Sequence, residues 1–200
     1  MAEETTRSAP APRLLAGLAT SRETAAQYDR WAAPYRGNPA ALQALLRTAR
    51  ILKYLCYLLY PALLAAAFWG VDLGGLLPAT AGAAWGSPFL RILLSSTLGF
   101  ALETAIRAAI DAPRPYERLG IDPLIRKDTK GRSFPSRHVF SIYAIATCWL
   151  AVSLPMGLAL MAAGVILAWT RVLGGVHTPR DVVAGALLGI ALCGLGCFVL

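Results

Sequence analysis

This chain of 200 residues is poor in histidine, cysteine and acidic side chains. It has two histidines, four cysteines, and 11 Asp and Glu residues against 19 Lys and Arg residues. The cysteines all lie in apolar segments, at Cys56, Cys148, Cys193 and Cys197. Such cysteines usually behave as small core residues, and no histidine stands near to complete a metal site. The sequence therefore predicts neither a disulfide framework nor a zinc site.

Apolar residues, in contrast, are abundant. They make up 56% of the chain, and the mean hydropathy is +0.55. They are concentrated in blocks that approach the roughly 20 residues needed to span a bilayer as a helix. This pattern predicts an integral membrane protein of the plasma (cytoplasmic) membrane, folded as an all-α, polytopic transmembrane helical bundle.

The net charge of +8 raises the question of nucleic-acid binding, but the distribution of the charges argues against it. Most of the basic residues fall in the first 50 residues and between Asp111 and Arg137, beside the apolar blocks. A nucleic-acid-binding domain would instead carry a basic face on a soluble fold. Most of these charges are typical of segments that contact anionic lipid headgroups. We expect a membrane and no nucleic acid as partner.

The chain divides into an N-terminal segment, residues 1–37, and a transmembrane domain, residues 38–200. The first segment is rich in Ala with scattered Arg and Glu. This composition fits either an amphipathic helix on the membrane surface or a disordered tail, and we favour a partial helix with a frayed start.

Cap signals delimit the predicted spans. Asn38-Pro39 and Ser87-Pro88 each pair a capping side chain with a first-turn proline. Residues 71–86 contain four glycines and one proline, which predicts a loop. Five spans follow, or six if this loop crosses after all. Their predicted bounds are 39–70, 89–110, 136–154, 155–173 and 179–200.

Three polar clusters interrupt the apolar background, at residues 107–114, 134–138 and 171–181. The first closes the second span and the second opens the third, so both lie on one side of the membrane. Spans three and four cross and return, so the third cluster reappears on that side. Charge near a membrane is costly unless it has a function. The topology therefore predicts one site built from all three clusters.

The side chains of these clusters suit a phosphate. Arg107, Arg114 and Arg171 carry planar cationic forks that match phosphate oxygens. Ser136 and the N–H groups at the start of the third span add further donors. His138 and His177 supply two imidazoles, one to attack phosphorus and one to protonate a departing alcohol.

Asp181 lies four residues after His177 and is predicted to hold the far N–H of that ring. Each residue also has a structural explanation. Glu103 offers Arg107 an i,i+4 salt bridge, Asp181 completes a capping box with Thr178, and Ser136 is a candidate helix cap. We favour the functional interpretation because all the candidates converge on one face.

The spacing of these residues resembles the signature of the type 2 phosphatidic acid phosphatase (PAP2) superfamily. That signature reads Lys-x6-Arg-Pro, then Pro-Ser-Gly-His, then Ser-Arg-x5-His-x3-Asp. Here its parts are Arg107-x6-Arg114-Pro115, Pro135-Ser136-Arg137-His138 and Thr170-Arg171-x5-His177-x3-Asp181. Three positions depart from it: Arg107 replaces lysine, Arg137 replaces glycine and Thr170 replaces serine.

The resemblance implies a role for each matched residue. His177 would be the nucleophile that forms a phosphohistidine, Asp181 would orient it, and His138 would protonate the leaving oxygen. The remaining matched residues would bind the phosphoryl group: Arg107, Arg114, Ser136, Arg137 and Arg171. The resemblance implies no metal and no cofactor, and the sequence has no carboxylate cluster suited to Mg²⁺.

The apolar blocks make a lipid phosphate the expected substrate, either an isoprenoid phosphate or diphosphate or a phosphoglycerolipid. Two alternatives remain at this point, a vanadate-dependent haloperoxidase and a non-catalytic, phosphate-recognising membrane scaffold. The loop at 71–86 lacks Lys and Arg, so the positive-inside rule favours a cytoplasmic site for five spans. The sequence leaves a homodimer open.

Overall fold

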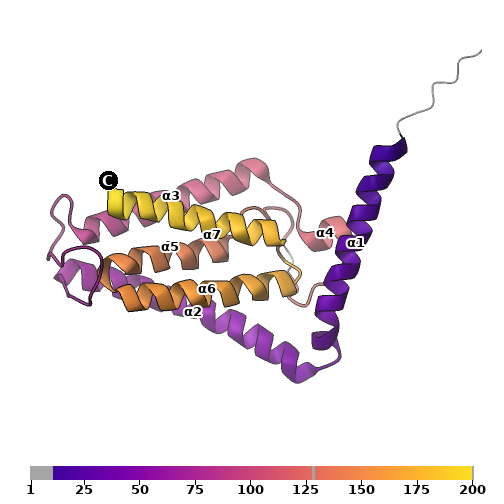
Figure 1. Cartoon of the computed structure of the whole chain (residues 1–200), viewed down its shortest axis with the longest axis horizontal. Helices are drawn as coiled ribbons and strands as arrows, with labels where there is room; N and C mark the ends of the chain where they lie inside the picture. Colours follow the sequence, from indigo (N-terminus) through magenta and orange to yellow (C-terminus); the bar gives the residue numbers. More distant parts are fainter. Residues whose placement is uncertain (1–10, 128, 200) are drawn as a thin grey trace, which may run out of the picture.

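The structure is a computed structural model that describes residues 11–127 and 129–199. Within these residues the chain is all-helical, without strands, as the sequence predicted (Figure 1). The helices are α1 (Ala11–Arg36), α2 (Pro39–Trp69), α3 (Pro88–Ile110), α4 (Pro115–Leu119), α5 (Arg137–Val152), α6 (Leu154–Leu173), α7 (Pro179–Gly194) and a final π-helical turn, η1 (Leu195–Val199).

Five apolar helices form a bundle, with α5 between the others (Figure 1). In the described part of the chain, four helices are long and apolar enough to cross a membrane: α2, α3, α6, and α7 with η1. Helix α5 has 16 residues and buries Phe140, Ile142 and Cys148 almost completely. It packs mainly against α6 and α7. The five apolar helices predicted from the sequence are all present.

Local caps fix where the first two of these helices begin. The Oδ1 of Asn38 accepts hydrogen bonds from the N–H groups of Ala40 and Ala41, both at 3.1 Å. The Oγ of Ser87 accepts one from Leu90 N at 3.4 Å. These bonds satisfy N–H groups that have no partner within the helix.

Residues 71–86 form an irregular loop at the end of the bundle where α5 and α6 meet. Leu76 N donates to Leu150 O at 2.9 Å, and Leu154 N donates to Gly74 O at 3.1 Å. These bonds hold the loop at the α5–α6 turn, so it does not cross the bundle. The bundle therefore has five apolar helices, and residues 71–86 do not form a sixth.

Helices α5 and α7 approach closely because α7 carries glycine where they meet. A Cβ atom on Gly185 would lie 2.7 Å from Ser136 O, and one on Gly189 would lie 2.7 Å from Phe140 O. Two small residues four positions apart are suited to such a close helix contact. It sets the position of Ser136 against the start of α7.

The N-terminal segment contains helix α1, which lies across one end of the bundle beside α4 (Figure 1). Residues 1–10 of the predicted segment lie outside the described residues. Tyr28 and Ala32 are buried against Ile121. Tyr28 Oη accepts a hydrogen bond from Leu124 N at 3.1 Å, and Arg36 Nη2 donates to Asp122 O at 2.8 Å. Helix α1 therefore holds the loop that follows α4.

The four cysteines are buried and unpaired. Cys148, Cys193 and Cys197 belong to the main apolar core of α5, α7 and η1. Their role as small core residues is the one that their apolar surroundings predicted.

Candidate active site

The structure brings the three polar clusters together at the end of the bundle that carries α1 and α4. The guanidinium of Arg107, at the end of α3, donates to the carbonyl oxygens of Arg132 and Pro135. Ser136 N donates to Asp181 O at 2.9 Å, which joins the start of α5 to the start of α7. Clusters far apart in sequence therefore form one continuous site.

Three buried arginines define the floor of this site. Arg107, Arg114 and Arg171 are 7, 5 and 6% exposed. Within the described residues, the Nε of each has no hydrogen-bond partner. A buried charge is costly unless it is paired and hydrogen-bonded. The three arginines therefore form a site suited to binding an anion, which we call the phosphoryl cradle.

Arg107 has a structural role as well. Its Nε lies 3.4 Å from Oε1 of Glu103, so the i,i+4 salt bridge considered from the sequence is present. Its two terminal nitrogens hold the carbonyls of the segment that leads into α5. Arg107 thus fixes the backbone on which Ser136 is carried.

Ser136 occupies the N-cap position of α5, yet its side chain makes no cap hydrogen bond. The residue is fully buried, and its Oγ has no partner among the described residues. The sequence suggested two roles for Ser136, a helix cap and a donor to phosphate, and its side chain does not act as the cap. Its hydroxyl and the N-terminus of α5 remain available to an anion.

His177 lies in the α6–α7 turn and is 3% exposed. Its Nδ1 is 3.7 Å from Oδ2 of Asp181, longer than a hydrogen bond. That oxygen accepts hydrogen bonds from Thr178 N at 2.8 Å and from Ser133 Oγ at 2.7 Å. Asp181 therefore completes the capping box with Thr178 and also faces His177. The sequence did not identify Ser133, because its contact depends on the folded loop.

The surroundings of His177 also act on its protonation. Burial lowers the pKa of His177, and the negative charge of Asp181 opposes that decrease. Arg114 and Arg107 lower the pKa further. The ring is therefore neutral at neutral pH, which is the form able to act as a nucleophile.

His138 lies in the first turn of α5 and lines two adjoining cavities. One, of about 260 Å³, is also lined by Lys53, Phe100 and Arg137. The other, of about 300 Å³, is also lined by Lys127 and is described below. Unlike His177, His138 has no carboxylate within 4.0 Å in the described part of the chain.

The side chain of Arg137 pairs with an acid. Its Nε lies 3.4 Å from Oε2 of Glu103, its Nη2 donates to Thr104 Oγ1 at 3.1 Å, and its guanidinium lies over the Phe100 ring. Glu103, which is fully buried, thus links Arg107 to Arg137. The guanidinium forms part of a cavity wall beside His138.

Three further cations lie near His138 that the sequence did not single out. Arg50 and Lys53 come from α2, and Lys127 comes from the loop after α4. Lys53 is the one charged residue in the apolar stretch 51–71. An isolated charge in such a stretch is the sequence signal that could have identified it as a functional residue.

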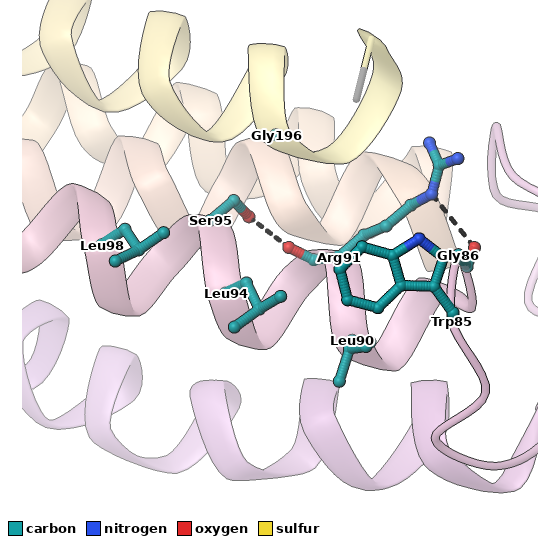
Figure 2. A pocket seen from close by; sticks show the side chains of 8 residues that line it. All are labelled: Trp85, Gly86, Leu90, Arg91, Leu94, Ser95, Leu98 and Gly196. Atoms are coloured by element: carbon teal, nitrogen blue, oxygen red, sulfur yellow. Dashed lines mark hydrogen bonds between the residues drawn. The ribbon is translucent and has the colours of Figure 1, made fainter.

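A different hollow lies about 25 Å along α3 from Arg107, given 1.5 Å of rise per residue. Figure 2 shows that it is lined by Trp85, leucine side chains of α3 and Arg91, whose Nε donates to Gly86 O at 3.0 Å. It contains none of the predicted site residues. Across the described residues, no three His, Cys, Asp or Glu side chains gather closely enough to hold a metal ion.

Comparison with known proteins shows the family and the fold. The model of the PAP2 superfamily matches residues 88–198. A stretch of 64 residues is 42% identical to Putative undecaprenyl-diphosphatase YbjG of Escherichia coli (strain K12), covering 30% of this chain and 31% of that protein. The chain thus matches less than a third of the length of this relative.

Two solved structures share the fold. LpxE of Aquifex aeolicus superposes with a TM-score of 0.59 at 23% identity, covering 80% of this chain and 86% of that one. The first transmembrane PAP2-type phosphatidylglycerolphosphate phosphatase from Bacillus subtilis superposes with a TM-score of 0.63 at 19% identity, covering 90% and 84%. At these identities the likeness shows a shared fold.

Proposed function

Because this chain belongs to the PAP2 superfamily, we propose that it is a membrane lipid phosphatase that works through a phosphohistidine intermediate. The observation that carries the proposal is the buried cradle of Arg107, Arg114 and Arg171 beside His177. The Nε groups of Arg114 and Arg171 have no partner among the described residues, that of Arg107 faces Glu103, and a neutral imidazole lies near Arg107 and Arg114.

In the first step, the phosphoryl group of the substrate binds the three arginines, Ser136 and the backbone N–H of Arg137 at the start of α5. His177 attacks phosphorus through Nε2, because Nδ1 faces Asp181. The bond between phosphorus and the leaving oxygen breaks, and His138 donates a proton to that oxygen. Asp181 stabilises the charge that develops on the His177 ring.

In the second step, His138, now neutral, removes a proton from water, which attacks the phosphohistidine. The N–P bond breaks, inorganic phosphate leaves and His177 returns to its neutral form. Neither step assigns a role to a metal ion. Stabilisation by preorganised cations is the main source of catalysis in this scheme.

The lipid tail has a route to His138 from the side of the bundle. The cavity of about 260 Å³ beside His138 is lined by Phe100 and Ser141. These two residues also line a cavity of about 290 Å³ that continues between α2, α3 and α5. A substrate placed along both would keep its tail among apolar side chains and its phosphate at the end of the bundle.

We further propose that the site faces the cytoplasm. The segments at its end carry most of the basic residues, whereas residues 71–86, at the other end, have none. A cysteine introduced at Gly120 would then react with a membrane-impermeant maleimide only in inverted vesicles. Labelling in intact cells would contradict this orientation.

The activity itself is tested by phosphate release from purified protein with chelator present, using phosphatidic acid and polyprenyl phosphate or diphosphate. The account predicts turnover by the wild type and none by His177→Ala or His177→Asn. Normal turnover by either variant would overturn the mechanism. Failure of the wild type on every lipid would favour the scaffold, and vanadate-dependent halide oxidation would favour the haloperoxidase.

A further inference from the structure

A second cationic cavity adjoins the phosphoryl cradle. It has a volume of about 300 Å³ and is lined by Arg50 and Lys53 of α2, Lys127 of the loop after α4, and Arg171 and His138. The loop is held in place here, because Ile125 N donates to Gly174 O at 3.0 Å.

The positive charge of this cavity has no matching acid. None of its lining residues is acidic. Within residues 11–127 and 129–199, none of its four cations lies within 4.0 Å of a carboxylate. Burial, together with the charges of Arg114 and Arg171, lowers the pKa of Lys127 to about 8. Side chains of one sign around a cavity repel one another, and an anion between them would relieve that repulsion.

The position of the cavity indicates which part of a substrate would enter it. It shares Arg171 with the cradle for the transferred phosphoryl group. It also shares His138, the residue proposed to protonate the leaving oxygen. His177 and Ser136 do not line it. The cavity therefore lies on the leaving-group side of the reacting phosphorus.

We propose that this cavity, through Arg50, Lys53 and Lys127, binds a second phosphate carried on the leaving group of the substrate. The proposal rests on the proposed phosphatase function and narrows its substrates to lipids that carry two phosphates. Lys53 and Lys127 are half-buried and would contact the anion directly, whereas Arg50 is exposed and would lie at the edge of the cavity.

For a lipid diphosphate, the step is as follows. His177 Nε2 forms a bond to the terminal phosphorus, and the bond from that phosphorus to the bridging oxygen breaks. The electron pair stays on the bridging oxygen, which leaves as part of a lipid monophosphate. Lys53 and Lys127 stabilise the charge that this leaving group gains. Water then releases inorganic phosphate from His177.

Two kinds of lipid share this chemistry. One is a diphosphate, in which the second phosphate adjoins the reacting one. The other is a phosphoglycerolipid whose headgroup holds a phosphodiester as well as a terminal phosphate. The experiment therefore compares two substrate pairs in detergent: polyprenyl diphosphate against polyprenyl monophosphate, and phosphatidylglycerol phosphate against phosphatidic acid.

The measured quantity is the ratio of kcat/KM within each pair. We expect the wild type to prefer the two-phosphate member of at least one pair by about tenfold or more, as a contact between charged groups allows. Lys53→Gln and Lys127→Gln should each lower that ratio several-fold, and the double variant should bring it near one. Lys130→Gln, on the same loop but outside the cavity, should leave the ratio unchanged.

The pair whose ratio depends on the lysines identifies the source of the second phosphate. A wild-type ratio near one in both pairs would overturn the proposal, as would a ratio that Lys53→Gln and Lys127→Gln leave unchanged. Absence of turnover by the wild type on all four lipids would instead contradict the phosphatase function, so the two failures are distinguishable.

Discussion

Oδ2 of Asp181 lies 3.7 Å from Nδ1 of His177 while it accepts a 2.7 Å hydrogen bond from Ser133 Oγ. A third group, Thr178 N, donates to the same oxygen at 2.8 Å. The carboxylate is thus held from two sides before it meets the imidazole. Its position, and through it that of His177, depends on a loop residue and on the cap of α7.

The hydrogen bond from Ser133 gives the first prediction. Ser133→Ala removes a bond to a charged group, and such bonds contribute about 1.5–3 kcal/mol. Because the Asp181 oxygen that faces His177 would then be held by Thr178 N alone, we expect kcat/KM to fall about tenfold or more. Ser153→Ala is the matched control, since Ser153 is also buried but lies at the other end of α5 without a side-chain cap bond. Equal activity of the two variants would contradict a positioning role for Ser133.

The close contact between α5 and α7 gives the second prediction. A Cβ on Gly185 would lie 2.7 Å from Ser136 O and 3.2 Å from Phe140 N, both backbone atoms that cannot turn aside. We expect Gly185→Ala to cost about 1–3 kcal/mol, as overpacking does, and to lower both the Tm in detergent and the activity. At Gly194 the nearest atom would be 3.9 Å away, so Gly194→Ala should preserve both. A Tm unchanged in Gly185→Ala would show that the helices are free to separate.

The third prediction concerns helix α1, which supports the loop that carries Lys127. Tyr28→Phe leaves Leu124 N without the hydroxyl that it now reaches at 3.1 Å. We expect faster limited proteolysis within residues 121–127 and a several-fold rise in KM for two-phosphate substrates. Tyr35→Phe, elsewhere on α1, should change neither. Unaltered proteolysis in Tyr28→Phe would mean that α1 does not brace this loop.

The protonation of Lys127 gives a pH prediction. Its pKa of about 8 lies below the ordinary lysine value, so the side chain loses its charge as pH rises through 8. The groups that act on it, Arg114, Arg171, Arg107 and Lys53, are all basic, so none of them offsets the effect of burial. The kcat/KM for a two-phosphate lipid should therefore decrease above about pH 8. The free energy of unfolding should increase over that range, because the unfolded state binds the extra proton.

Lys127→Arg provides the control, since arginine stays charged throughout this range. This variant should lose the decrease near pH 8 while retaining turnover. The same decrease in Lys127→Arg would assign the titration to another group.

The parts of this structure that the sequence predicted depend on local signals. Asn38-Pro39 and Ser87-Pro88 set helix starts through hydrogen bonds to the next few residues. The number of apolar helices between His138 and His177 was enough to place both histidines at the same end of the bundle. Lys53 and Ser133 escaped prediction because their environments come from packing between distant segments. No local pattern specifies that packing. The pairing of Arg137 with Glu103 is of the same kind, since it joins residues of two helices.

The central claim is that His177 becomes phosphorylated during turnover, and trapping that intermediate tests it most directly. His138→Asn removes the base for the second step, whereas the first step proceeds without its proton when the leaving group is a lipid monophosphate, which is a far weaker base than an alkoxide. Mixing this variant with a lipid diphosphate and quenching in alkali should therefore accumulate the phosphoenzyme. Mass spectrometry should then locate one phosphoryl group on the peptide that contains His177. A phosphoryl group on any other residue would contradict the account, as would turnover by wild-type protein whose His177 is never modified.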